Sequence, residues 1–200
     1  MGCDHVFIEL ALSHPDLKLG QILGIAAVRT DRKGKPLTAF SEKVKPETDF
    51  TPEEKTHVEE NFAIGDRYSG ESLSQVVKDL KSSVLSKRYD SKYVIVATHA
   101  ESVRAFLGEE VFGKKPWLDI LAISWPLAYH DHVSDRTFDS LCKSFKVENT
   151  APDTATGNCE ALVRVYWAMM TRYKTALGGE EILREVGGSP LEHLRKYIGL

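Results

Sequence analysis

Glu9 is the first residue whose type and position could support chemistry. It lies in the stretch VFIELALSHPDLKLG, where an apolar strand carries one carboxylate and then leads into a polar loop. Side chains two positions apart on a strand point to the same face, so two carboxylates at that spacing can hold one divalent metal ion. The residue two positions after Glu9 is Ala11. The strand therefore offers one half of such a pair.

The apolar pattern around this stretch predicts an α/β fold with a mixed sheet. Val6–Leu10 reads as a buried strand, Gln21–Thr30 as a second, and Leu37–Lys45 as a half-exposed edge strand that the turn TDRKGKP joins to it. Lys92–Thr98 is a continuous apolar run, typical of a strand in the middle of a sheet. A helix precedes this run, and a strand, helix and strand in this order favour parallel pairing. We expect antiparallel hairpin strands followed by parallel strands, flanked by helices.

Capping signals and helical spacing predict the helices. Thr51–Glu54 (TPEE) is a capping box with Pro at the first helical position, and Ser72 with Gln75 forms a second such pair. The stretch Trp117–Ser124 fits either a short strand or a helical turn. Apolar residues at helical spacing predict further helices over Leu73–Val84, Ser102–Phe112, Phe138–Phe145 and about Gly157–Leu177.

Composition and charge exclude several classes of protein. The chain has 200 residues, of which 42% are apolar, and its net charge of −3 provides no overall attraction to nucleic acid. The 3 cysteines have no CxxC spacing, which favours neither a disulfide framework nor a zinc site. No apolar stretch is long enough to span a membrane, so we expect no membrane partner. These features together predict a cytoplasmic protein.

The chain divides into one domain and a short tail. The breaks GGEE and GGSP precede an amphipathic segment, SPLEHLRKYIGL, that has its own capping signal. We assign residues 1–178 to a single folded domain and residues 179–200 to a C-terminal helical tail.

Three stretches carry motifs that are similar to those of a known family. They are VFIELALSH with the hairpin GQILGIAAVRTDRKGKP, then VIVATHAESVRAFL, and finally PDTATGNCEALVRVYWAMM. In this order they resemble the three motifs of the DnaQ-like (DEDD, RNase T-like) 3′–5′ exonucleases of the ribonuclease H-like superfamily. The resemblance implies a ribonuclease H-like mixed sheet. It also implies a site where carboxylates hold two Mg²⁺ ions and a His or Tyr serves as general base.

Most residues at the positions of that chemistry have changed. The Asp-x-Glu of the first motif falls on Glu9 and Ala11, and the Asp of the second falls on Val103. The Asp of the third motif falls on Asn158, and the general-base His falls on Asp153. Glu9 is thus the only carboxylate left at the metal-ligand positions, and the base is missing. No intact catalytic site and no cofactor are expected.

The resemblance and these losses together imply a catalytically degenerate exonuclease fold that acts as a binding module. Its partner is an unidentified protein, a single-stranded nucleic acid, or both, and many relatives in the family pair as homodimers. A weaker alternative is that the vacated cleft holds a nucleotide or another small molecule without metal chemistry.

An active metal-dependent 3′–5′ exonuclease with relocated ligands stays open as the alternative enzyme. Glu101 and Glu160 each lie two positions from a motif residue, and with Glu9 and Asp153 they could rebuild a site for Mg or Mn. Two positions along a helix correspond to a rotation of about 200°, which places Glu101 and Glu160 on other faces than the motif positions. If any metal ligand remains, it is Glu9.

Basic residues offer weak candidates for phosphate contacts. They are Arg32, Lys33 and Lys35 beside Arg29 at the hairpin, and Lys114 and Lys115 before Trp117. Solvated turns also contain such residues, and the acidic net charge favours that simpler interpretation.

Histidines and tryptophans give further candidates. His130 and His132 are two positions apart, a spacing that could place both on one metal ion if they lay on a strand. We expect an ordinary surface loop instead, because the sequence indicates no third metal ligand nearby. His99 follows the central strand and either lines a pocket or makes a plain hydrogen bond. Trp125 and Trp167 are expected in the core or lining a pocket.

Overall fold

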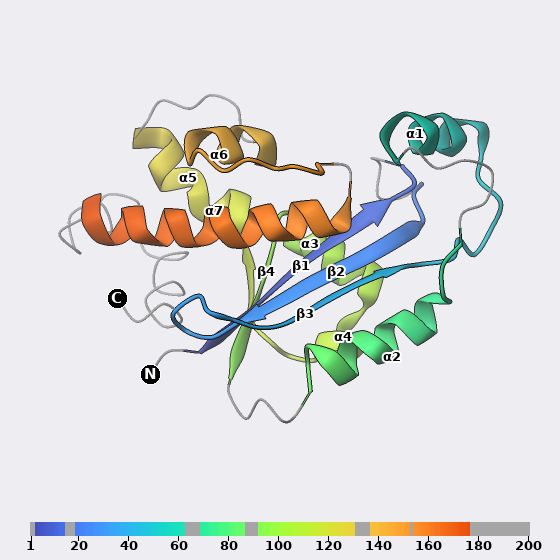
Figure 1. Cartoon of the computed structure of the whole chain (residues 1–200), viewed down its shortest axis with the longest axis horizontal. Coiled ribbons are helices and arrows are strands. Elements are labelled where there is room, and N and C mark those ends of the chain that lie inside the picture. Colours follow the sequence, from blue (N-terminus) through green and yellow to red (C-terminus); the bar gives the residue numbers. More distant parts are fainter. Residues whose placement is uncertain are drawn as a thin grey trace.

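A mixed sheet runs through the middle of the molecule with helices around it, as the computed structural model shows (Figure 1). The structure describes residues 3–14, 19–62, 69–86, 92–130, 137–152 and 154–176. The strands are β1 (Asp4–Leu12), β2 (Ile22–Thr30), β3 (Pro36–Lys43), β4 (Tyr93–Ala97) and β5 (Trp117–Asp119). The helices are α1 (Pro52–Phe62), α2 (Leu73–Ser83), α3 (Ala100–Leu107), α4 (Glu109–Phe112), α5 (Ile120–His130), α6 (Phe138–Ser144) and α7 (Ala155–Ala176).

The five strands lie in the order β3-β2-β1-β4-β5. β1 pairs with β2, and β2 with β3, in antiparallel register, whereas β4 pairs in parallel with both β1 and β5. This confirms the expected hairpin strands, the buried central strand and the parallel crossover pairing. β3 forms one edge of the sheet, as its half-exposed pattern predicts.

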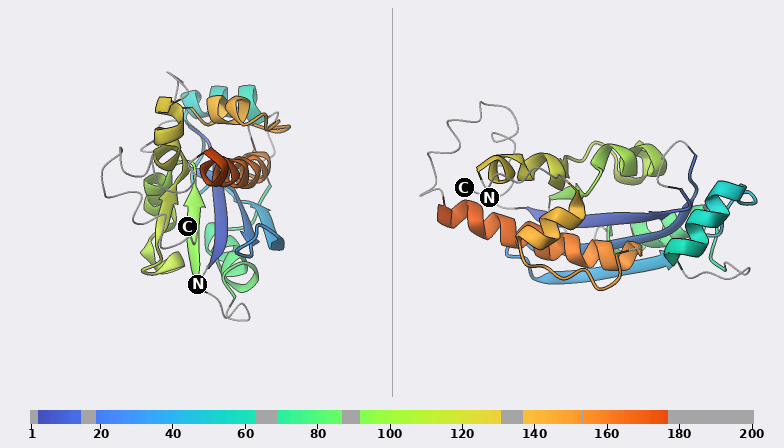
Figure 2. Two further views of the ribbon diagram at one scale, coloured as in Figure 1. Left: turned by 90° about the vertical axis from the view of Figure 1, so that its left-hand side faces the viewer. Right: turned by 90° about the horizontal axis from the view of Figure 1, so that it is seen from above.

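Two apolar clusters cover the two faces of the sheet. One joins α5, α6 and α7 to Phe7, Ala26 and Val96, and the other joins α2, α3 and α4 to Ile8 and Ile95. Neighbouring residues of one strand thus enter different clusters, because strand side chains alternate between the faces. The long helix α7 runs along β1 and β2 (Figure 2).

The first predicted capping box is confirmed and the second is only half formed. Glu54 N donates to Thr51 Oγ1 at 3.2 Å, and Thr51 N donates to Glu54 Oε2 at 2.9 Å, at the start of α1. Gln75 N donates to Ser72 Oγ at 3.3 Å, but the Gln75 side chain donates to Asp79 instead of returning to the cap.

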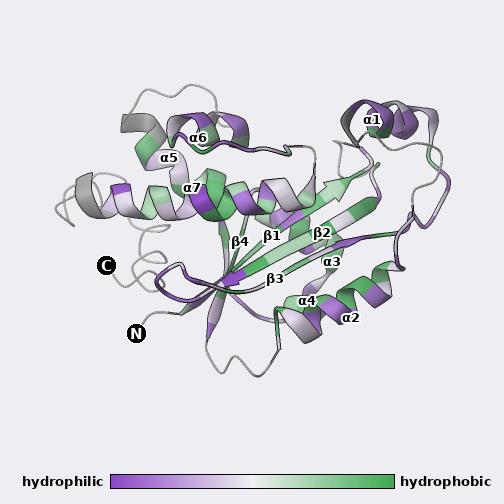
Figure 3. Ribbon diagram, in the orientation of Figure 1, coloured by the Kyte–Doolittle hydropathy of each residue, from purple (hydrophilic) through white to green (hydrophobic). Residues whose placement is uncertain are grey.

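Figure 3 shows how differently α1 and α2 are built. α1 is hydrophilic around most of its surface, and Val58 is its one buried apolar side chain among those described. α2 carries both hydrophobic and hydrophilic positions, and it buries Val76 and Leu80. α2 therefore contributes to the core, while α1 borders it.

The helical stretch predicted over Ser102–Phe112 is confirmed except at Gly108, which divides it into two helices. Gly108 adopts a φ of +76° and separates α3 from α4, in a conformation that side chains other than glycine rarely adopt. The stretch Trp117–Ser124 contains both alternatives, since β5 ends at Asp119 and α5 begins at the next residue.

Two further expectations need correction. Trp125 is 38% exposed, so it is not a core residue. Arg29 is fully buried and pairs with Asp4 at 2.9 Å, so it does not join the exposed basic residues of the hairpin. Trp167 is partly buried against the core, as expected.

The tip of the β2–β3 hairpin packs on α7. Gly34 has a φ of +87°, and a Cβ atom there would come within 2.9 Å of the Trp167 ring. The hairpin therefore needs glycine at this turn, both for its backbone angle and for the close approach to the helix.

Some expectations concern residues whose structure is not described. The tail 179–200, Asp153 and His132 all lie outside the described residues. Among the helices that are described, none combines the length and apolarity needed to cross a bilayer.

Candidate functional site

Glu9 lies toward the carboxyl end of β1 and is only 7% exposed. Its Oε1 atom accepts hydrogen bonds from Thr98 N, at 2.8 Å, and from Thr98 Oγ1. Thr98 directly follows β4, so parallel pairing of β1 and β4 brings the two residues together. Burial raises the pKa of Glu9 to about 7; the Thr98 hydrogen bonds lower it and the charge of Asp119 raises it. Glu9 thus titrates near neutral pH.

Asp119 is a residue of the site that sequence analysis missed. It ends β5, and its carboxylate accepts from Ala100 N at 3.0 Å, from Leu121 N at 2.9 Å and from Ala122 N at 3.2 Å. Asp119 therefore holds the starts of α3 and α5. An Asp between a strand and a helical pattern, in the stretch WLDILA, is the signal that could have indicated this capping role.

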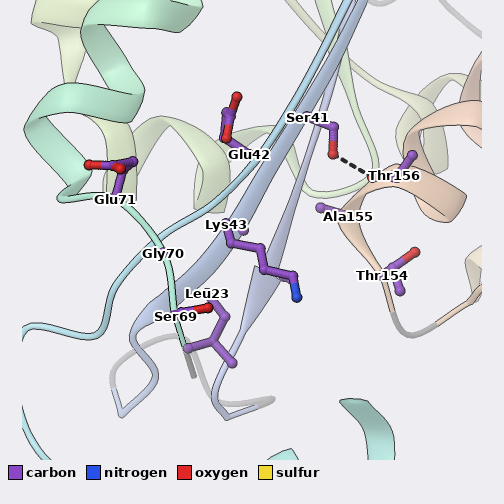
Figure 4. Close-up of a pocket in the computed structure, with 12 residues that line it drawn as sticks. Leu23, Ser41, Glu42, Lys43, Ser69, Gly70, Glu71, Thr154, Ala155 and Thr156 are labelled. Atoms are coloured by element: carbon purple, nitrogen blue, oxygen red, sulfur yellow. Dashed lines mark hydrogen bonds between the residues drawn. The ribbon is translucent and has the colours of Figure 1, made fainter. Parts of the chain in front are cut away.

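Ala11 borders a cavity of about 850 Å³ between β3 and the start of α7 (Figure 4). We name it the Ala11 cavity. Its described lining is Ala11, Leu23, Gly24, Ser41, Glu42, Lys43, Ser69, Gly70, Glu71, Thr154, Ala155 and Thr156. A Cβ atom built on Gly24 would lie 3.6 Å from the Ala11 Cβ and 3.9 Å from the Ala155 Cβ, so small residues form one wall.

Charges are distributed unevenly around the Ala11 cavity. Figure 4 shows the Lys43 side chain extending toward the side of Thr154, whereas the Glu71 side chain extends away from it. The first residues of α7 also line the cavity, and the N-terminal end of a helix carries positive partial charge. Its α7 side therefore has a positive character.

The two remaining metal-ligand positions of the motifs, Val103 and Asn158, provide no carboxylate. Val103 is 4% exposed and belongs to the apolar cluster under α2 and α3. Asn158 lies in the first turn of α7, and its Oδ1 accepts from Asn149 Nδ2 at 2.8 Å. A valine offers no ligand atom, and the Asn158 oxygen is already engaged.

These residues do not fit a pair of Mg²⁺ ions. Such ions need several anionic oxygen ligands, and of the positions that match the metal ligands of the motifs only Glu9 is a carboxylate, with its Oε1 held by Thr98. Within the described ranges, no three His, Cys, Asp or Glu side chains gather into a potential metal site. Glu101 and Glu160, the candidates for relocated ligands, are both exposed.

The weaker candidates are not gathered at the Ala11 cavity. His99 precedes α3, is exposed and makes no side-chain capping bond. His130 ends α5. Arg32, Lys33 and Lys35 are exposed at the β2–β3 turn, and Lys114 and Lys115 are exposed just before β5.

The strand directions place both basic groups away from the cavity. The β2–β3 turn lies beside the start of β1, and Lys115 stands over the Tyr93 ring, 4.7 Å from its centroid, at the start of β4. Glu9 and Ala11 lie toward the opposite ends of the parallel strands. The candidate phosphate contacts and the motif positions therefore occupy opposite ends of the sheet.

Known proteins are similar to this chain in fold but not in sequence. No protein-family profile matches the sequence, and no curated protein matches it significantly. Solved structures match well in shape. A 3′-exonuclease that recognises the 3′ end of the histone mRNA stem-loop has a TM-score of 0.66 at 13% identity, over 86% of this chain and 83% of its own.

Two other nucleases are similar to the chain in the same way. E. coli exonuclease I in complex with a dA16 oligonucleotide has a TM-score of 0.65 at 13% identity, over 87% of this chain and 42% of its own. Cell-death related nuclease 4 has a TM-score of 0.67 at 11% identity, over 85% of this chain and 64% of its own. The chain thus has the fold of the DnaQ-like 3′-exonucleases, a ribonuclease H-like mixed sheet with flanking helices.

Proposed function

We propose that this protein is a catalytically degenerate exonuclease-fold module that binds a partner instead of cleaving nucleic acid. The observation that carries the proposal is the state of the ligand positions. Glu9 is buried against Thr98, Ala11 borders a cavity, Val103 lies in the core and Asn158 bonds to Asn149. A two-metal phosphoryl transfer has too few anionic ligands at these positions.

The proposed partners are a single-stranded nucleic acid or a protein. Exonuclease I binds a dA16 oligonucleotide, and the histone mRNA exonuclease recognises an RNA 3′ end, which supports the first class. The exposed basic residues at the hairpin and before β5 are the candidate phosphate contacts. We propose a cytoplasmic location, no requirement for Mg or Mn, and homodimerisation as a further property to be measured.

A degradation assay tests the loss of catalysis. A 3′-labelled single strand, as DNA and as RNA, is incubated with excess protein and Mn²⁺, and with chelator as control. We expect no shortening of either strand. Metal-dependent shortening that disappears in Glu9→Ala would refute the proposal and indicate that ligands have relocated. Glu59→Ala serves as the matched control, because that carboxylate is exposed on α1 and is not among the candidate ligands.

A further inference from the structure

The edge strand β3 directs alternate backbone groups out of the sheet. Val44 N donates to Leu23 O at 2.9 Å, so the even-numbered residue just after β3 bonds inward to β2. The odd-numbered Lys43 bonds outward, since its carbonyl accepts from Glu71 N at 3.1 Å. Donors and acceptors alternate in this way along an antiparallel strand.

Two residues of β3 therefore present outward N–H and C=O groups. They are Ala39 and Ser41, both exposed, and within the described part of the chain these outward groups have no backbone partner outside the sheet. Leu37 lies at a register shift between β2 and β3, where the alternation is interrupted. Glu71 already forms backbone hydrogen bonds with the same edge, because Lys45 N also donates to the Glu71 carbonyl at 2.7 Å. The edge thus accepts an added strand at one end and is open along the rest.

Two hollows follow this edge on the α7 side of the sheet. The first is the Ala11 cavity beside Ser41 and Lys43. The second, of about 180 Å³, lies beside Ala39, with Ala26 and Val28 in its lining, and we name it the Ala39 hollow. Both hollows include Ser41 and Thr156 in their lining. The hydroxyl groups of these two residues bond to each other at 2.6 Å beside the Ala11 cavity (Figure 4).

The spacing of the hollows matches an extended peptide. Side chains two positions apart on a strand project to one face, and residues opposite Ala39 and Ser41 on an added strand would have that spacing. Their side chains would point to the α7 face, where Ser41 contacts Thr156. An added strand therefore places one side chain at each hollow.

The lining of each hollow selects a type of side chain. The Ala39 hollow has apolar walls and Glu160 at its border, which favour an apolar side chain over an acidic one. At the Ala11 cavity, Lys43 and the start of α7 favour a carboxylate. Exposed Lys33 and Lys35 lie beyond the other end of β3, so positive charge flanks the open edge.

We propose that β3 binds an extended acidic peptide segment of a protein partner as a sixth strand of the sheet. An apolar side chain of the segment enters the Ala39 hollow, and an Asp or Glu two positions along lies beside Lys43. This inference rests on the proposed binding role and names its partner class. Strand addition uses main-chain hydrogen bonds for affinity and the hollows for specificity.

Selection from a phage-displayed library of linear dodecapeptides on the full chain tests the proposal. We expect enriched peptides with net negative charge and an apolar residue two positions from an Asp or Glu. The best peptide is synthesised, and calorimetry measures its affinity for each variant. Ala39→Pro removes only an outward N–H and leaves the inward ladder to β2 intact. We expect affinity to fall at least about ten-fold in Ala39→Pro and in Lys43→Glu.

Two controls separate the edge from folding and from general charge effects. Lys78→Glu makes the same charge reversal at an exposed position of α2 and should leave affinity unchanged. N-methylation of the peptide amides that face β3 should abolish binding, while methylation of the intervening amides should not. This second control needs no change in the protein, so it holds even if Ala39→Pro fails to fold.

Several results would overturn the proposal. They are the absence of enriched peptides, affinity that is insensitive to both Ala39→Pro and N-methylation, displacement of the peptide by oligo(dT), or a wild-type dimer in sedimentation that Ala39→Pro dissociates. The last two would assign the edge to nucleic acid or to a second copy of the chain. The degradation assay has a separate readout, so activity there would refute the proposed function without bearing on peptide binding.

Discussion

At the scale of single residues, Glu9 is a carboxylate that the fold buries toward the carboxyl end of β1. Its carboxyl group is buried, and Thr98 supplies two hydrogen bonds to one oxygen. Ala11, two positions along β1, offers no second carboxylate with which Glu9 could hold a cation that would stabilise its charged form. The remaining acid then titrates near neutral pH, where burial favours its protonated form.

This titration predicts a pH-dependent stability. The pKa of Glu9 is about 7 in the folded protein against an ordinary value of 4.5, so the folded state keeps a proton that the unfolded state loses as pH rises from 4.5 to 7. Stability due to Glu9 is therefore fully present below this window and is lost through it, by about 3 kcal/mol. Relative to wild type, Glu9→Gln should gain that amount between pH 4 and pH 8, as measured by urea unfolding.

The comparison of variants is necessary because another buried residue acts in the opposite direction. Burial lowers the pKa of His5 to about 4, so stability due to His5 is present above its ordinary pKa of 6.5 and is lost as pH falls toward 4. The wild-type pH curve is the sum of both effects. An equal stability difference between wild type and Glu9→Gln at pH 4 and pH 8 would contradict the assignment to Glu9.

At the scale of elements, a buried ion pair holds the sheet together at the end away from the Ala11 cavity. Arg29 near the end of β2 donates to Asp4 at the start of β1, at 2.9 Å, and to the carbonyl of Val84 after α2, at 3.1 Å. Its guanidinium also lies over the ring of Tyr93, 5.1 Å from its centroid, at the start of β4. One side chain thus joins three strands and a helix.

Arg29→Met should therefore cost about 3–5 kcal/mol of unfolding free energy, because it leaves the Asp4 carboxylate buried without its charged partner. Urea unfolding measures the loss. Arg104→Met is the matched control: its pair with Glu109 is exposed, with side chains 52% and 66% accessible, and should contribute no more than about 1 kcal/mol. Similar losses in both variants would mean that burial does not set the strength of the Arg29 pair.

The elements that sequence predicts best depend on local signals. The Thr51–Glu54 capping box needs only adjacent residues, and the strand Lys92–Thr98 is apolar throughout. Ser102–Phe112 was predicted as helical without a break. The break at Gly108 depends on a backbone angle that an isolated glycine in the sequence does not specify. Trp117–Ser124 was ambiguous because a strand and a helix meet inside it at Asp119.

The contacts of the candidate site are harder to predict from the sequence, because they join residues that are far apart in the chain. Motif resemblance identified the positions Glu9, Ala11, Val103 and Asn158, but it did not indicate that Asn149 engages Asn158. Asp119 was missed because its capping of α3 depends on the pairing of β4 with β5. Arg29 was grouped with the basic turn because its buried partner, Asp4, lies on another strand.

At the scale of the whole molecule, the fold separates three regions. The motif positions lie toward the carboxyl ends of β1 and β4. The basic residues of the β2–β3 turn, with Lys114 and Lys115, lie at the opposite end of the sheet, and the open edge of β3 extends between the two ends. In α/β sheets, ligands commonly bind at the carboxyl ends of parallel strands. The Ala11 cavity lies at that end of the sheet.

Restoring the carboxylates tests whether the fold still holds the ligand geometry. The triple variant Ala11→Glu, Val103→Asp, Asn158→Asp returns anionic oxygens to the motif positions beside Glu9. Without metal it should be less stable than wild type, because Asp at position 103 places a carboxylate in an apolar cluster. With Mn²⁺ it should recover about 3 kcal/mol when the ion is about a hundred-fold above its dissociation constant, since binding to the folded state stabilises by mass action.

Thermal unfolding with Mn²⁺ and with chelator measures this coupling in both proteins. Wild type should melt at the same temperature with Mn²⁺ and with chelator. Its metal-ligand positions provide one carboxylate, Glu9, and that group is buried against Thr98. Equal stabilisation of wild type and the triple variant would mean that the ion binds elsewhere. If the triple variant folds but its melting temperature does not change with Mn²⁺, the backbone around Glu9 does not place these carboxylates close enough to bind one ion. Restoring the side chains alone would then not restore a metal site.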